Sequence, residues 1–208
     1  MPDLLVGRHK EAYQRGDGGL ITDIFEGRIT STGFSSGNRI VIGDWRESHL
    51  GSFANVMWAR PDGTRVLLSP SRQHAEFVTG LYSFEEVSIV EIEIKRWKRG
   101  VEVRAGDLSI RATWGVPLPI PFWRPLWFIS TVESFLGRMI FGTRTHGRTK
   151  NDRREWYSVR SISRVLMADA NLRGEDMGEK ASFDADACFG FSEPPWMPSS
   201  VTLKTYIE

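Results

Sequence analysis

Apolar and polar residues alternate over short stretches along most of this chain. Such alternation is typical of half-buried β-strands, because successive side chains of a strand point to opposite faces of its sheet. Strands separated by short turns indicate an antiparallel, all-β architecture. The predicted strands are residues 27–34, 39–45, 53–60, 64–68, 87–98, 101–104, 108–114, 156–172, 182–191 and 200–207. Residues 156–172 fit either one long bent strand or a pair of strands, and residues 35–38 and 61–63 fit turns.

Roughly ten strands in one sheet tend to curl. The pattern therefore predicts a mainly β fold, either an antiparallel β-barrel or, as the alternative, a two-layer β-sandwich. Residues 1–208 form a single globular domain in this interpretation, because no linker divides them. Residues 1–19 fit a short N-terminal helix, near residues 3–15, or a loose arm. One or two helical turns are expected over residues 71–77, with Ser71 as the N-cap.

Residues 116–142 break the alternation with a strongly apolar stretch. Its first part contains four prolines, which favour an extended chain. Over residues 126–141 the apolar positions recur at helical spacing, which predicts an amphipathic helix. We expect this helix to pack on the sheet or close one end of a barrel. The alternative is a contact of segment 116–142 with a membrane surface or a partner protein, since aromatic residues flanked by arginines suit an interface.

A short motif bears on the type of barrel. Gly43-Asp44-Trp45 is a Gly-x-Trp sequence within a predicted strand. It resembles the motif near the first barrel strand of lipocalins, the calycin-like barrels in which that tryptophan helps to seal the barrel floor. The resemblance covers three residues, and the chain lacks the disulfide cysteines of that family. It favours the barrel over the sandwich and implies no activity.

Composition limits the classes of binding partner and cofactor that the chain is expected to have. The net charge of +1 gives no global field for nucleic acid, so no specific nucleic-acid partner is expected. Cys188 is the single cysteine, which excludes an internal disulfide, and the four histidines show no zinc-ligand spacing. We therefore predict neither a metal nor a cofactor. The first residues lack the apolar core of a signal peptide, which leads to the expectation of a cytoplasmic protein.

Several motifs suggest chemistry, and each also has an ordinary structural explanation. Residues 33–37 match the Gly-x-Ser-x-Gly motif of hydrolases around Ser35, but a strand follows where a helix is needed, so a hairpin turn is predicted. The pairs His74 with Glu76 and His49 with Glu47 are candidate acid–base groups of an enzyme pocket. Asp184 and Asp186 form a weak candidate cation site. The basic stretch at residues 144–164 could bind phosphates or anionic lipid.

Eight tryptophans are the most unusual feature of the composition. Tryptophan supplies a large, rigid contact area, either for a core or for the wall of a ligand site. The predicted ligand-binding residues are six tryptophans. Four lie on strands, where alternate positions share a face: Trp45, Trp58, Trp97 and Trp114. Trp123 and Trp127 lie beside or within the predicted helix, which would act as a lid. The main functional hypothesis is therefore a protein that binds a small apolar or aromatic ligand inside a β-barrel. The alternatives are an enzyme built from scattered His and Glu residues and a surface-binding protein that acts through residues 116–142; the sequence indicates no oligomeric state.

Overall fold

The computed structural model describes residues 13–14, 20–21, 23–120, 146–182, 189–190 and 195–208. Within them the fold is mainly β, with one helix, which confirms the predicted fold class. The elements are β1 Tyr13–Gln14, β2 Leu20–Ile21, β3 Asp23–Phe34, β4 Arg39–Glu47, β5 Phe53–Ala59, β6 Arg65–Ser69, α1 Arg72–Leu81, β7 Glu86–Ile89, β8 Ile92–Trp97, β9 Gly100–Ala105, β10 Leu108–Trp114, β11 Leu118–Pro119, β12 His146–Arg148, β13 Arg154–Leu172, β14 Glu175–Asp176, β15 Lys180–Ala181 and β16 Ser199–Ile207.

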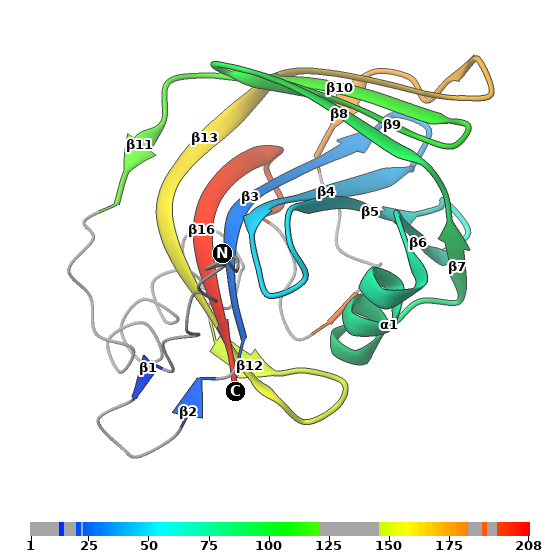
Figure 1. The fold of residues 1–208 in the computed structure, drawn as a ribbon. Helices are drawn as coiled ribbons and strands as arrows, with labels where there is room; N and C mark the ends of the chain where they lie inside the picture. Colours follow the sequence, from blue (N-terminus) through cyan, green and yellow to red (C-terminus); the bar gives the residue numbers. More distant parts are fainter. Residues whose placement is uncertain (1–12, 15–19, 22, 121–145, 183–188, 191–194) are drawn as a thin grey trace, which may run out of the picture.

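One large sheet contains every described strand except the pair β1–β2. Its main path runs in the order β7-β6-β5-β4-β3-β16-β13-β10-β9-β8. All neighbours along this path are antiparallel except β6 and β7, which are parallel. The sheet curls into a half-barrel, and Figure 1 shows β8, β9 and β10 arching over β3, β4 and β5.

The long strand β13 joins the two halves of the sheet. Its first part pairs with β16, from Glu155 opposite Ile207 to Arg164 opposite Ser199. Its second part pairs with β10, from Val165 opposite Trp114 to Leu172 opposite Leu108. Register shifts interrupt both ladders, and bulges of this kind bend a strand and increase its twist. Of the two interpretations of residues 156–172, the single bent strand is therefore confirmed.

The chain turns a corner between β7 and β8, the two ends of the sheet path. One long strand over residues 87–98 was the expectation, and this expectation is wrong, because Val90 and Glu91 separate β7 from β8. The Val90 N–H donates to the Ser69 carbonyl on the β6 side at 3.0 Å, whereas the Glu91 carbonyl accepts from Gly106 on the β9–β10 side at 3.2 Å. The two residues thus direct their backbone bonds to opposite halves of the sheet.

The concave face of the sheet is packed with apolar side chains from both halves. Ile40, Ile42 and Val56 from one half belong to the same buried cluster as Val103 and Ile110 from the other. Burying an aliphatic side chain of this size contributes about 1.5–3 kcal/mol relative to exposure. This cluster holds the half-barrel closed around its own core.

The helix α1 covers part of the convex face. Ser71 is its N-cap, as predicted, and its side chain accepts a hydrogen bond from the His74 N–H. Ala75 and Val78 pack with Leu67 of β6 in a separate buried cluster. The helix runs to Leu81 and is longer than the one or two turns that the sequence predicts.

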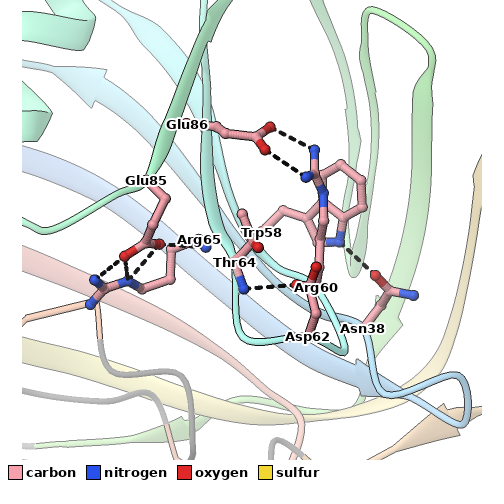
Figure 2. A network of polar contacts seen from close by, with 8 residues as sticks. All are labelled: Asn38, Trp58, Arg60, Asp62, Thr64, Arg65, Glu85 and Glu86. Carbon is pink, nitrogen blue, oxygen red and sulfur yellow. Dashed lines mark hydrogen bonds and ion pairs between the residues drawn. The ribbon is translucent and has the colours of Figure 1, made fainter.

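The β5–β6 hairpin confirms the turn predicted at Pro61-Asp62-Gly63. The Asp62 carboxylate accepts from the Thr64 N–H at 2.9 Å, and Gly63 adopts φ 87°, which favours glycine. Figure 2 shows that the hairpin is tied to β7 and the residue before it by two arginine–carboxylate pairs, Arg60 with Glu86 and Arg65 with Glu85. Hydrogen bonds from Arg65 lower the pKa of Glu85 to about 2. These pairs fasten the short parallel strand β7 beside the hairpin.

Some expectations differ from the structure or fall outside it. The short strand β12, which pairs with β13, lies where the alternation predicted no strand. Tyr13 and Gln14 form a strand, not the end of an N-terminal helix. The predicted helix at residues 126–141, the rest of the N-terminal helix and most of the strand at residues 182–191 lie outside the described residues. No helix among the described residues is long and apolar enough to cross a membrane.

Candidate functional site

A row of polar side chains crosses one end of the concave face. In an antiparallel ladder, directly opposite residues point to the same side of the sheet. Arg28 lies opposite Asp44, Thr30 opposite both Ile42 and Ser200, and Ser200 opposite Ser163. Because Ile42 belongs to the concave core, the row faces the inside of the half-barrel. The row, called the concave polar row below, comprises Arg28, Thr30, Asp44, Ser163 and Ser200.

An ion pair spans the concave face at this row. Asp44 of β4 is only 4% exposed, and the Arg96 side chain of β8 reaches it from the other end of the sheet path. The Arg96 guanidinium donates to both Asp44 oxygens, at 2.7, 2.9 and 3.1 Å. These hydrogen bonds raise the pKa of Arg96 and satisfy the buried carboxylate. Arg96 thereby neutralises the acid that lies opposite Arg28.

Arg28 is the unusual member of the concave polar row. Its half-buried guanidinium donates to Ser200 Oγ at 2.9 Å and lies 4.7 Å from the centroid of the Trp114 ring. Burial, followed by the like charge of Arg46, lowers the pKa of Arg28, against the charge of Asp44, which raises it; an arginine still remains charged at neutral pH. No carboxylate of the described residues lies within ion-pair distance of it. A guanidinium has five N–H donors, and the one hydrogen bond of Arg28 to a described side chain is that to Ser200, so within the described residues Arg28 retains donors for a ligand.

The hydroxyl groups of the row point to the same conclusion. Ser200 Oγ lies 2.9 Å from Thr30 Oγ1 and accepts a hydrogen bond from Arg28, so the Ser200 hydroxyl already has two hydrogen-bond partners. Ser163, opposite Ser200, is 2% exposed, and its Oγ has no hydrogen-bond partner among the described residues. A buried hydroxyl without a partner is uncommon and calls for an explanation. A cation and a hydroxyl with spare capacity on one face are suited to an anionic group.

The structure separates the predicted tryptophans. Trp114 is 5% exposed and is the one described tryptophan that lies against the concave polar row. Trp58 is also part of the concave core, but its Nε1 donates to Asn38 at 2.7 Å and Arg60 covers its ring (Figure 2). Trp97 is 40% exposed on β8, with Arg111 above its ring. Trp123 and Trp127 lie outside the described residues.

Trp45 explains the Gly-x-Trp motif in local terms. It lies on the convex face, next to Phe25, and its Nε1 donates to Asn55 Oδ1 at 3.2 Å. A Cβ on Gly43 would lie 2.5 Å from that oxygen, so glycine leaves room for the hydrogen bond. The lipocalin likeness is not confirmed, because the strand order and the parallel β6–β7 pair differ from an up-and-down barrel.

A second polar cluster lies on the convex face. Glu155 of β13 is 1% exposed, and the Tyr82 hydroxyl lies 2.9 and 3.1 Å from its two carboxylate oxygens. The Tyr157 hydroxyl is 2.6 Å from that of Tyr82. Burial raises the pKa of Glu155 to about 7, against the hydrogen bonds of both phenols and the charge of Arg153, which lower it. Burial and the Glu155 charge raise the pKa of Tyr82 well above 10.

This convex cluster is closed rather than open. Arg153, whose charge acts on Glu155, pairs with Asp23 at 2.6 Å, and Asp23 in turn lies 2.9 Å from His49 Nδ1. Thr205, opposite Tyr157, is 1% exposed, and its Oγ1 has no hydrogen-bond partner among the described residues. Phe25 and Phe77 pack beside His49. The cluster combines a buried acid with phenols, and we assign it to stability rather than to ligand binding.

The other candidate groups have structural roles or lie elsewhere. Ser35 begins the β3–β4 turn and its Oγ accepts from the Glu179 N–H, so the predicted hairpin turn is confirmed. His74 binds its own N-cap, with Nδ1 2.7 Å from Ser71 Oγ, and Glu76 is exposed on α1. Glu47 is exposed, whereas His49 pairs with Asp23. Asp184 and Asp186 lie outside the described residues.

Carboxylates from distant segments neutralise the basic stretch at residues 144–164. Arg153 pairs with Asp23, Arg154 with Glu208, and Arg160 with Glu26. Arg148 pairs with Asp152 inside the stretch. Trp156 is buried, at 1% exposure. Four arginines of the stretch therefore have carboxylate partners in the structure.

Sequence reasoning missed Arg28, Arg96, Ser163 and the Glu155 cluster. A partial signal was present, because Asp44 lies two residues after Ile42 in an alternating strand and so shares its apolar face, where a carboxylate needs a partner. The partner itself, Arg96, is 52 residues away along the chain. Its identity depends on how the sheet curls.

Comparison with known proteins gives little help with the site. No family model and no curated protein matches the chain. Two solved structures show a distant likeness. One is an acetoacetate decarboxylase with a TM-score of 0.43 and 12% identity, covering 89% of this chain and 86% of that one. The other is the acetoacetate decarboxylase of Legionella pneumophila with a TM-score of 0.39 and 11% identity, covering 98% and 89%. Likeness at these scores carries no argument about activity.

Proposed function

We propose that this protein binds a small molecule with a flat or apolar body and one anionic group, at the polar end of the concave face. The observation that carries the proposal is Arg28, a half-buried guanidinium without a carboxylate partner among the described residues. A carboxylate ligand would accept from the open Arg28 donors, as arginine binds planar anions through two parallel hydrogen bonds. This refines the hypothesis of an apolar or aromatic ligand by adding a charge.

Two neighbouring groups support this choice of ligand. The Ser163 hydroxyl, buried and without a partner among the described residues, can donate to the second oxygen of a carboxylate. Trp114 is 5% exposed and carries the Arg28 guanidinium over its ring, so it would hold Arg28 in place beside a ligand. Ligand sites in proteins are mostly apolar with a few placed polar groups. Trp114 is therefore the predicted tryptophan of the described part that we retain at the site, as the support of Arg28.

A matched pair of probes tests the proposal. We expect tryptophan fluorescence to report binding of 2-naphthoate, with at least tenfold weaker binding of the uncharged 2-naphthamide, because the amide cannot form a charge-assisted pair with Arg28. The variant Arg28→Met should remove this preference, whereas Arg28→Lys should retain part of it. Arg111→Met is the matched control, since Arg111 stacks on Trp97 on an exposed part of the sheet.

Three results would contradict the proposal. The first is equal binding of the acid and the amide. The second is a preference for the acid that remains in Arg28→Met, which would mean that another basic residue binds the carboxylate. The third is a loss of binding in Arg111→Met as large as that in Arg28→Met, which would point to a general effect of charge. Circular dichroism of each variant separates loss of binding from loss of fold.

A further inference from the structure

The outward side of the sheet carries exposed apolar side chains where β10 and β13 meet. Directly opposite residues of antiparallel strands point to the same side of a sheet. One row across β8, β9, β10 and β13 consists of Trp97, Gly100, Thr113 and Met167. Ala112 and Ala168, which adjoin Thr113 and Met167 in the sequence, belong to the concave core, so this row faces outwards.

The chain after β10 continues this outward surface along β13. The Gly115 N–H donates to the Arg164 carbonyl at 3.0 Å, and β11 then pairs with β13, as Figure 1 shows. Leu118 lies opposite Ile162. Because Ser163 belongs to the concave polar row, the adjacent Ile162 points outwards, and Leu118 points to the same side.

Exposure singles this surface out from the rest of the described chain. Leu166 lies beside Gly115, since a Cβ on that glycine would be 3.8 Å from its Cδ1. Eight large apolar side chains are exposed among the described residues, and five of them lie here. These five, called the apolar strip below, are Trp97 (40% exposed), Val116 (72%), Leu118 (68%), Leu166 (61%) and Met167 (57%). An exposed apolar patch of this kind marks a binding surface.

Cations flank the apolar strip. The turn between β8 and β9 consists of Lys98 and Arg99, both exposed, and Arg164 is exposed next to the strip on β13. None of the three has a carboxylate within ion-pair distance among the described residues. The neighbouring outward row differs, because its charges alternate in sign across the four strands: Lys95, Glu102, Arg111 and Asp169. Positive charge without a nearby acid is therefore concentrated beside the apolar strip.

The basic turn is held firmly against the sheet. Arg99 accepts a hydrogen bond from the Trp114 N–H at 3.0 Å, which fastens the turn to β10. The Trp97 ring lies directly on Gly100, where a Cβ would be only 2.1 Å from a ring carbon, so glycine is what leaves room for the ring. The cations and the tryptophan are thus presented at fixed positions, and little ordering is needed when a partner binds.

An exposed apolar strip flanked by cations is complementary to an anionic lipid bilayer. We propose that this surface, the β8–β11 surface, binds the face of an anionic membrane. The apolar strip would enter the boundary between head groups and acyl chains, and Lys98, Arg99 and Arg164 would meet the negative head groups. Of segment 116–142, for which the sequence suggested a membrane contact, Val116 and Leu118 belong to this surface.

The details of the surface favour lipid over nucleic acid. Bases stack on open aromatic rings, whereas Arg111 lies 5.4 Å from the centroid of the Trp97 ring and already covers it. The aliphatic members of the apolar strip match acyl chains instead. Pro117 and Pro119 have no N–H, so this edge loses fewer hydrogen bonds to water when it enters the membrane interface.

Vesicle sedimentation tests the proposal with the unmodified protein. The probes are vesicles of phosphatidylcholine alone and vesicles in which about a third of the lipid is phosphatidylserine. We expect at least tenfold tighter binding to the anionic vesicles, and this preference should shrink as salt rises, because salt screens exposed charges. Hydrogen exchange should slow in residues 97–100 and 115–119 on the anionic vesicles.

A pair of charge variants locates the cationic part of the contact. Lys98→Gln with Arg99→Gln should weaken binding to the anionic vesicles about tenfold or more. The matched control, Arg72→Gln with Lys150→Gln, also removes one arginine and one lysine, at exposed positions on α1 and on the loop that bonds to its last turn. It should weaken binding less than twofold.

A third variant tests the apolar part without changing the charge. Val116→Ser with Leu118→Ser should weaken binding to both kinds of vesicle about tenfold, because both side chains would leave water in the bound state. Circular dichroism of each variant separates loss of binding from loss of fold. The vesicle comparison and the exchange measurement need no variant, so they decide the matter even where a variant fails to fold.

Three results would overturn the proposal. Equal binding to the two kinds of vesicle, or binding to neither, would exclude recognition of anionic lipid. Exchange that slows in other residues but not in 97–100 and 115–119 would assign the membrane contact to another face. A single-stranded oligonucleotide that displaces the vesicles and protects the same residues more strongly would assign the surface to nucleic acid.

Discussion

The two faces of the sheet at β3 and β16 differ in which buried charge lacks an ion-pair partner among the described residues. On the concave face, Asp44 has a full arginine partner, and the group left without an ion pair among the described residues is the cation Arg28. On the convex face, the group without an ion pair is the acid Glu155, which two phenols surround. Arg28 keeps open donors beside a tryptophan, whereas the Glu155 oxygens already have hydrogen bonds. The same strands thus carry a candidate ligand site on one side and a pH-sensitive structural cluster on the other.

The strongest test of the concave side removes Arg96. Arg96→Met leaves Asp44 buried without its cation. We expect a loss of about 3 kcal/mol of unfolding free energy, the low end of the range for buried pairs, because the Arg96 end of the pair is partly exposed. Urea unfolding measures the loss. The double variant with Asp44→Asn should regain most of it, because the uncompensated charge is gone. A loss below about 1 kcal/mol in Arg96→Met would mean that Arg28 takes over Asp44, since only exposed pairs are worth so little.

The convex side predicts a pH dependence. Because the folded-state pKa of Glu155 is about 7, above its ordinary value of 4.5, the folded protein binds this proton more tightly than the unfolded chain. The stability from this group is therefore full below pH 4.5 and is lost as the pH rises through about 7. The span is on the order of 3 kcal/mol. Glu155→Gln should remove this part of the pH dependence in unfolding experiments from pH 4.5 to pH 8, and an unchanged profile would show that Glu155 does not titrate in this range.

Tyr82→Phe should give a smaller effect on the same cluster. The change removes the hydroxyl that contacts both Glu155 oxygens, and loss of a hydrogen bond to a charged group costs about 1.5–3 kcal/mol. We expect that loss at pH 8, where Glu155 is charged, and a clearly smaller loss at pH 5, where it is protonated. Thermal unfolding at the two pH values measures the difference, and equal losses would contradict the assignment of charge to Glu155.

The smallest effects distinguish the two unpartnered hydroxyls. Thr205→Val on the convex face should be neutral or stabilise by up to about 1 kcal/mol, since a buried hydroxyl without a partner loses its desolvation cost. Ser163→Ala should change stability as little but weaken binding of 2-naphthoate, because Ser163 belongs to the proposed ligand site. If Ser163→Ala leaves ligand binding unchanged while Thr205→Val reduces it, the roles of the two faces are reversed.

Local features of the fold could be predicted from the sequence. The alternation at residues 39–45 predicted a strand, which the structure contains as β4. Ser71 was predicted as a helix N-cap, and Pro61-Asp62-Gly63 as a hairpin turn, because both depend on chemistry within a few residues. The mainly β, curled architecture also followed from the number and spacing of strands. The strand, the cap and the turn each need information from one short segment only, and the curl needs only the number of such strands along the chain.

The candidate site was decided by the tertiary structure. Alternation cannot show that the stretch at residues 87–98 breaks at Val90, since the corner depends on bonds to Ser69 and Gly106 in two different parts of the sheet. It also cannot show that Asp44 meets Arg96, or that Arg28 lies beside Ser200, which is 172 residues away. The sequence by itself determined which residues alternate, turn and cap, because those properties are local. Only the curl and register of the sheet decided which charge found a partner and which stayed open, because that depends on segments brought together from opposite ends of the chain.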